Sequence, residues 1–142
     1  MIPNILCIDD DEISLMLNEF LCELTVFGKK VSLSTRPDEI IEDLKIIYKE
    51  GTVEDIPDLM LLDLNMPIMN GWQFLDTLIG IDPDFANKLK IVVLSSSVDP
   101  KDKEKAADYP NIILFQPKPM TETVLAELKE HPLLIRHFTA PH

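Results

Sequence analysis

Short apolar runs recur along the chain, separated by stretches long enough to hold one helix each. The runs are Ile5–Ile8, Val31–Leu33, Leu59–Leu62, Ile91–Leu94 and Ile112–Phe115. Because their apolar residues are consecutive and do not alternate with polar ones, the runs predict strands that are covered on both faces. Repeated alternation of strand and helix predicts an α/β fold with a five-stranded parallel sheet and right-handed crossovers.

The segment after the first run has the clearest helical periodicity. Its apolar residues recur at three- and four-residue steps: Ile13, Leu17, Phe20, Leu24 and Phe27. This spacing predicts an amphipathic helix with these side chains towards the core. Gly28 follows directly and is predicted to end the helix.

Caps and turn-forming residues predict four further helices. They are a helix opened by Pro37 and ended by Gly51, one from Gly71 to Ile79, one opened by Asp99 and Pro100 and running through Ala107, and one capped by Thr121. The polar stretches 50–58 and 81–88 are expected to be loops.

Composition narrows the function classes. The chain has 142 residues, 46% of them hydrophobic, which suits one globular domain, and we expect a single domain over residues 1–142. Its net charge of −12 argues against nucleic acid or an anionic membrane as a direct partner. Cys7 and Cys22 lie in apolar patterns and are expected to be buried thiols. The sequence shows no signal peptide or membrane-spanning run, so we expect a cytoplasmic protein.

Chemically active side chains follow four of the predicted strands. In open α/β sheets, ligands bind at the carboxyl ends of the strands. The residues at those ends are Asp9, Asp10 and Asp11, then Asp63, then Ser95, Ser96 and Ser97, and finally Lys118. Clustered carboxylates favour a hard divalent cation, and nearby Lys and Ser donors suit a phosphoryl group. Asp11 and Glu12 fall where the helix begins, where negative charge is favourable, so we assign them no chemistry.

Four motifs in order carry a resemblance to a known family. "IDDD", "LLDLNMPIMNG", "VVLSSS" and "PKP" follow the first, third, fourth and fifth strands. Together they resemble the receiver domain of two-component response regulators, in particular the single-domain, chemotaxis-receiver-like kind. The resemblance implies a flavodoxin-like (βα)5 fold, a three-layer sandwich with strand order 2-1-3-4-5.

The resemblance also implies the chemistry. Asp63 would accept a phosphoryl group from a sensor histidine kinase or a histidine phosphotransfer protein. Asp9, Asp10, Asp63 and the main-chain carbonyl of Asn65 would hold one Mg²⁺, with Mn²⁺ possible. The domain would catalyse its own phosphorylation and dephosphorylation, and it would act as a signalling phosphoacceptor that has no separate enzyme activity.

The same resemblance assigns the remaining residues. Lys118 and Ser95 would bind the phosphoryl oxygens, and Ser95 with Phe115 would form the switch. Asn65 and Ser97 occupy the two positions that tune phosphate lifetime in this family. The output would be a changed surface for an unidentified downstream protein.

Two alternatives stay open at this point. Asp9 and Asp11 have the spacing of the nucleophile and second acid of a haloacid-dehalogenase-like phosphatase, although a late acidic pair is missing. A pseudo-receiver would have the fold without being phosphorylated. The apolar tail, 132–142, is expected to pack on the core, or else to form a partner surface. Whether the chain is a stand-alone regulator or part of a longer protein is left open.

Overall fold

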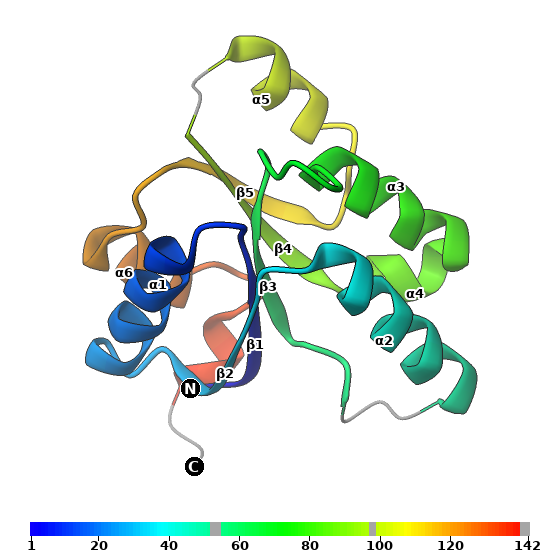
Figure 1. The fold of residues 1–142 in the computed structure, drawn as a ribbon. Coiled ribbons are helices and arrows are strands. Elements are labelled where there is room, and N and C mark those ends of the chain that lie inside the picture. Colours follow the sequence, from blue (N-terminus) through cyan, green and yellow to red (C-terminus); the bar gives the residue numbers. More distant parts are fainter. Residues whose placement is uncertain (52–54, 97–98, 140–142) are drawn as a thin grey trace.

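The computed structural model describes residues 1–51, 55–96 and 99–139, and these form one five-stranded parallel sheet between layers of helices (Figure 1). The strands are β1 (Ile2–Ile8), β2 (Gly28–Ser34), β3 (Leu59–Asp63), β4 (Lys90–Ser95) and β5 (Ile112–Pro117). Their order is β2-β1-β3-β4-β5, and every pairing is parallel. The predicted fold class and strand order are therefore confirmed.

Seven helical segments connect and cover the strands. They are α1 (Glu12–Leu24), α2 (Pro37–Glu50), α3 (Gly71–Ile81), α4 (Pro83–Asn87), α5 (Pro100–Ala106), α6 (Glu122–Lys129) and the 3₁₀ helix η2 (Ile135–His137) within the described residues. The predicted caps are confirmed at Asp99 and Thr121, whose side chains accept hydrogen bonds from the first turns of α5 and α6. Gly51 ends α2 in the left-handed conformation, with φ of 69°.

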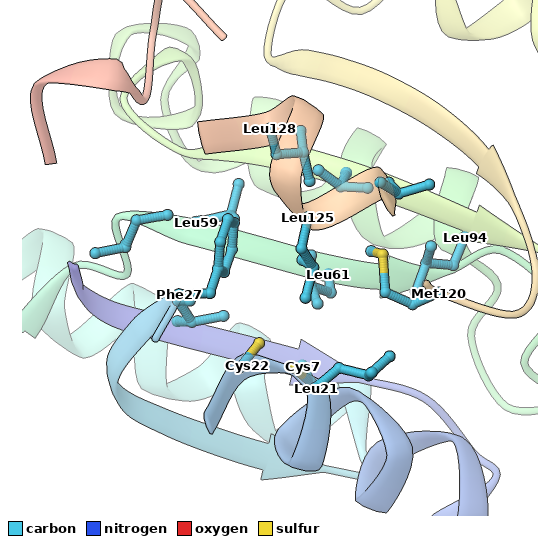
Figure 2. Packing of buried hydrophobic residues seen from close by; sticks show 14 of the residues in the cluster. Cys7, Leu21, Cys22, Phe27, Leu59, Leu61, Leu94, Met120, Leu125 and Leu128 are labelled. Atoms are coloured by element: carbon cyan, nitrogen blue, oxygen red, sulfur yellow. The ribbon is translucent and has the colours of Figure 1, made fainter. Parts of the chain in front are cut away.

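Two apolar clusters fill the space on either side of the sheet. In β1, Ile5 and Cys7 join the cluster beneath α1 and α6, whereas Leu6 and Ile8 join the cluster beneath α2, α3 and α4. Figure 2 shows the first cluster, in which Cys7 and Cys22 lie among leucine side chains. Both cysteines are free and buried, as predicted. The consecutive apolar residues of the strands therefore serve both faces.

The predicted orientation of the first helix is wrong. The residues that face the core are Leu15, Asn18, Leu21 and Cys22, whereas Ile13, Leu17, Phe20 and Leu24 are exposed. This helix carries two apolar stripes, so periodicity alone does not fix its rotation. Its start is fixed by Asp11, whose side chain caps it, and by the short connection from β1.

The predicted end of the first helix also needs correction. Thr25 is its C-cap, Val26 has a φ of 53°, and Phe27 is buried after the helix has ended. Gly28 is the first residue of β2. The reversal therefore occurs at Val26, a residue type that rarely adopts this conformation.

One of the two predicted loops contains a helix. Asp82 accepts a hydrogen bond from Asp84 N at 2.8 Å and Pro83 follows it, so α4 begins with the same Asp-Pro signal as α5. Phe85 and Ala86 of α4 are buried. In the stretch 50–58, the described residues outside α2 belong to no long element, and residues 52–54 lie outside the described ranges.

The C-terminal segment packs on the core, which was the first of the two possibilities expected for it. Leu134 is 1% exposed and belongs to the cluster beneath α1 and α6. Phe138 stacks on Phe27 with ring centroids 5.4 Å apart, and Lys129 lies over the Phe138 ring. Met1 donates a hydrogen bond to the His137 carbonyl at 2.6 Å, so this segment lies beside the chain's first residue (Figure 1).

Among the helices of the described ranges, none has both the length and the apolar character needed to cross a bilayer.

We expect Leu134→Ala to lower the free energy of unfolding by about 2–4 kcal/mol, because it empties a buried site beneath α1 and α6. Ile135→Ala is the matched control: Ile135 is 42% exposed, and its change should stay within about 0.5 kcal/mol. Urea denaturation followed by circular dichroism measures both. Equal effects of the two substitutions would contradict the packing of this segment.

Candidate functional site

The alignment of β1 with β3 places two carboxylates side by side. Ile8 pairs with Leu62, so the residues that follow, Asp9 and Asp63, meet at the carboxyl edge of the sheet. Both are 1% exposed, whereas Asp10 lies on the surface. One carboxylate oxygen from each of the three lies within 4.8 Å of the others. The predicted acidic residues are thus brought together.

Lys118 reaches these carboxylates from the end of β5. Its Nζ donates a hydrogen bond to Asp9 Oδ2 at 2.7 Å and lies 3.3 Å from Asp63 Oδ1. Its main-chain N–H donates to the Ser95 carbonyl at 2.8 Å, and the bond to Pro119 is cis. Burial alone would lower the pKa of Lys118, but the hydrogen bond to Asp9 and the charge of Asp63 raise it. Lys118 is therefore a fixed cation of the site.

Burial and a neighbouring charge perturb the Asp63 carboxylate. Burial raises the pKa of Asp63, and the nearby charge of Asp9 raises it further. The Asn65 N–H, which donates to Asp63 Oδ1 at 3.2 Å, and Lys118 act in the opposite direction. The raised pKa means that the Asn65 N–H and the Lys118 ammonium do not fully offset the burial of Asp63 and the charge of Asp9.

Of the four consecutive acids, Asp11 takes part in the start of α1, as expected. The Asp11 side chain accepts from Ile13 N at 2.9 Å and from Ser14 Oγ at 3.2 Å, so it caps α1. The Asp11 N–H in turn donates to Asp9 Oδ1 at 2.9 Å. Asp9 is therefore held on both oxygens, by Asp11 and by Lys118. Asp11 is engaged in a helix cap, which argues against its role as the second acid of a phosphatase.

Asn65 and the serines after β4 form the adjoining wall. Asn65 Nδ2 lies 3.4 Å from Ser95 Oγ and 3.2 Å from Ser96 Oγ. Ser95 is fully buried at the end of β4, whereas Ser96 is exposed. The contact to Ser96 was not expected from the motifs. Ser97, the predicted second lifetime-tuning residue, lies outside the described residues.

Gly71 explains part of the "DLNMPIMNG" motif. A Cβ at this position would lie 3.0 Å from the Leu64 Cα and 3.1 Å from the Asp63 carbonyl oxygen. Asn70 and Gln73 form a capping box at the start of α3, and Gly71 N donates to the Leu64 carbonyl at 3.0 Å. Because no side chain intervenes, α3 packs directly against the main chain that carries Asp63.

Phe115 lies near the middle of β5 and is partly buried against the cluster beneath α2 and α3. It borders a pocket of about 290 Å³ that also includes Pro100 and Lys103 of α5. The predicted switch residues Ser95 and Phe115 therefore lie on neighbouring strands.

Asn18 is a site residue that the motifs did not reveal. It is 4% exposed on the core side of α1 and borders a pocket of about 50 Å³ together with Lys118 and Met120. The sequence does place this polar residue on the same helix face as Leu15 and Cys22. Recognising it as buried requires knowing which face of α1 points to the core.

The donor set fits a divalent cation. Three carboxylates converge while Lys118 is the one described basic side chain that forms an ion pair with them. Carboxylate oxygens with this excess of negative charge are suitable ligands for Mg²⁺ or Mn²⁺. Asp10 and Asp63 are the residues best able to hold the ion, since both oxygens of Asp9 already accept hydrogen bonds.

Comparisons with known proteins agree with this geometry. The sequence model of the response regulator receiver domain matches residues 5–129. A two-component response regulator from Cytophaga hutchinsonii is 31% identical, with a TM-score of 0.81, over 91% of this chain and 95% of that one. A response regulator receiver protein from Dyadobacter fermentans is 29% identical, with a TM-score of 0.73, over 97% and 99%.

A CheY-like receiver domain protein from Methanospirillum hungatei shares the fold at 17% identity, with a TM-score of 0.71, over 97% of this chain and 98% of that one. A search of curated protein sequences finds no match. The chain belongs to the response regulator receiver family, a family of signalling domains in two-component systems. The chain is therefore not a member of the haloacid-dehalogenase-like phosphatase family.

We expect Asp63→Asn to raise the free energy of unfolding of the metal-free protein by about 1–3 kcal/mol at pH 8. The folded state raises the pKa of Asp63, so stability is lost as the pH rises from the unfolded value near 4 through the folded one. The gain should therefore shrink towards pH 4.

Thermal denaturation in EDTA at several pH values measures this effect. The exposed Asp43→Asn is the charge-matched control and should change the unfolding free energy little. A less stable Asp63→Asn protein at pH 8 would contradict the conclusion that burial and the charge of Asp9 disfavour the ionised Asp63 carboxylate.

Proposed function

We propose that Asp63 is a phosphoacceptor that takes a phosphoryl group from a histidine kinase or a histidine phosphotransfer protein. The observation that carries this proposal is the buried Asp63 carboxylate, which lies beside Asp9 and Asp10 and 3.3 Å from the Lys118 ammonium. In the reaction, a bond forms between an Asp63 carboxylate oxygen and phosphorus as the bond from phosphorus to the donor imidazole nitrogen breaks.

Each neighbouring residue has a part in this transfer. Lys118 is positioned to pair with a phosphoryl oxygen, and Ser95 to donate a hydrogen bond to another. A divalent ion, when bound by Asp10, Asp63 and the Asn65 carbonyl with Asp9 nearby, neutralises charge on the transferring group. Asn65, beside the two serine hydroxyls, would tune how readily water reaches the acyl phosphate. Ser97 would be the second residue that tunes the lifetime of the phosphate.

The response would reach the surface through β4 and β5. Ser95 would move towards the new phosphoryl group, and Phe115 would take a more buried position as it does so. A helix that could follow is α5, because Ala106 is its one buried residue within the described range. The product of phosphorylation would therefore be an altered surface around α5 and β5 that a downstream protein recognises.

We expect incubation with acetyl phosphate and Mg²⁺ to add one phosphoryl group, measured as about 80 Da by intact-mass spectrometry. Asp63→Asn should abolish the adduct, and EDTA should suppress it because the charge on the transferring group is then not neutralised. Lys118→Ala should leave Mg²⁺ affinity largely intact while impairing the conformational response. Absence of an adduct in the wild-type protein would favour the pseudo-receiver alternative.

The exposed apolar face of α1 is proposed as the surface that receives the phosphodonor. Ile13, Met16, Phe20 and Leu24 are 77%, 65%, 58% and 54% exposed, and Leu17 is 38% exposed. Together these five residues are called the α1 stripe. Large apolar side chains gathered on one face of a surface helix mark an interaction site more often than isolated ones do.

The position of the α1 stripe supports a phosphodonor protein as its occupant. α1 begins at Glu12, directly after the site acids, so a protein that brings phosphohistidine to Asp63 has to cover the first turn of α1. The stripe continues this covered area along the helix, and Glu12 and Glu23 border it. The matching donor surface is therefore an apolar ridge with basic residues at its edges, such as one helix of a helical bundle.

We expect the double substitution Ile13→Ser and Phe20→Ser to slow phosphotransfer from a protein donor by about tenfold or more. Phosphorylation by acetyl phosphate should stay unchanged, because that small molecule needs no docking surface. Radiolabelled transfer from purified phosphotransfer proteins of the same organism measures the first rate. Ile46→Ser, on the exposed side of α2, is the control. Equal slowing with both donors would place the effect in the site and not in docking.

A further inference from the structure

Another pocket lies at the amino-terminal ends of the strands, opposite to the carboxyl ends where Asp63 lies. It has a volume of about 140 Å³ and is bordered by the approaches to β3 and β4 and by the C-terminal segment. Its lining residues are Ile56, Pro57, Asp58, Lys88, Lys90, Leu133, Leu134, Arg136 and His137. Since β3 spans five residues, the pocket is about 15 Å from the acidic site. It shares no residue with that site.

The charge of this pocket is opposite to that of the whole protein. Lys88, Lys90 and Arg136 line it together with one carboxylate, that of Asp58, in a chain of net charge −12. Within the described ranges, none of these three basic side chains forms an ion pair at 4 Å or less. Asp58 Oδ2 already accepts a hydrogen bond from Asn4 N at 3.0 Å. Three basic side chains thus border the pocket with one carboxylate. Lys88 also lies close enough to Asp82 to help lower the pKa of that carboxyl, and Lys90 Nζ donates to the Lys88 carbonyl at 3.5 Å.

His137 belongs to the same electrostatic environment. Burial lowers the pKa of His137, the charge of Arg136 lowers it further, and Asp58 opposes them. Its main-chain carbonyl accepts the hydrogen bond from Met1, which fixes the segment at the pocket wall. An anion in the pocket would offset the mutual repulsion of these groups.

Part of the pocket wall lies beyond the stretch that the family model matches. The receiver model ends at residue 129, whereas Leu133, Leu134, Arg136 and His137 come after it. Leu134 anchors this C-terminal segment in the core. The basic wall on this side is therefore held on a packed segment, and Lys88 and Lys90 supply the other wall from the approach to β4.

We propose that this pocket binds a compact oxyanion, a phosphate or carboxylate group carrying at most a small apolar part. Arg and Lys side chains recognise both oxyanions, the guanidinium through paired N–H donors. A volume near 140 Å³ resembles that of a cavity able to hold benzene. Leu133, Pro57 and Ile56 supply an apolar wall for such a group. The proposal does not depend on phosphorylation of Asp63.

The test is an NMR titration of the ¹⁵N-labelled full chain in EDTA, with inorganic phosphate and benzoate as separate probes and sodium chloride at matched ionic strength. We expect saturable shifts in the amide signals of Lys88, Lys90, Arg136 and His137 with at least one probe. The ratio of the two affinities identifies whether phosphate or carboxylate is preferred. The double variant Lys88→Gln and Arg136→Gln should weaken binding by about fivefold.

The control double variant is Lys29→Gln with Lys101→Gln, which removes the same charge at exposed positions elsewhere. Its affinity should match that of the wild-type protein. The proposal is overturned if sodium chloride reproduces the shifts, if the shifts do not saturate, or if they map to Lys118. It is equally overturned if the two double variants weaken binding to the same extent. Acetyl phosphate labelling of Asp63 is scored separately, so failure of one proposal leaves the other standing.

Discussion

The parallel pairing of β1 with β3 forces two carboxylates into one buried place, and much of the molecule accommodates that constraint. Ile8 and Leu62 are aligned, so Asp9 and Asp63 follow at the same edge. At about 4 Å such a pair repels by about 4 kcal/mol near a protein surface. Lys118 at the end of β5 offsets part of this repulsion, and the N–H groups of Asn65 and Asp11 offset a further part. The remaining excess of negative charge is what makes the site receptive to a divalent cation.

The same constraint explains why the sequence predicted so much of the site. Strand ends are fixed by apolar runs, and parallel strands place all their carboxyl ends at one edge. Reading the residue after each run was therefore enough to assemble Asp9, Asp63, Ser95 and Lys118. The side-chain partners of Asn65 were less accessible, because Ser96 is set by the path of the main chain after β4.

Helix rotation was the part that the pattern could not determine. α1 has apolar residues on both faces, and the longer stripe proved to be the exposed one. The buried face includes the polar residue Asn18, which made the buried stripe look less apolar than the exposed one. The five-residue helix α4 was missed for a related reason, since Asp82 and Pro83 are a start signal in a stretch read as polar. Local capping by Asp11 and Asp82 carried the decisive information in both places.

The contacts of α5 bear on how a charge at Asp63 could alter a distant surface. α5 buries little of its own, and it is joined to α3 through Trp72, which stacks on Tyr109 with centroids 5.3 Å apart and donates to Asp102 at 3.3 Å. Lys105 lies over the Trp72 ring, and Tyr109 donates to Asp76 at 2.7 Å. Such exposed polar contacts are weak individually.

α5 contributes one buried residue, Ala106, whereas α1 and α6 pack on a continuous core, so we expect a movement at the end of β4 to displace α5 more readily. Ser95 sits where such a movement would begin, because its carbonyl accepts from Lys118 N and its hydroxyl lies near Asn65. We therefore expect the part that holds the acids and presents α1 to stay in place, and the part around α5 to respond.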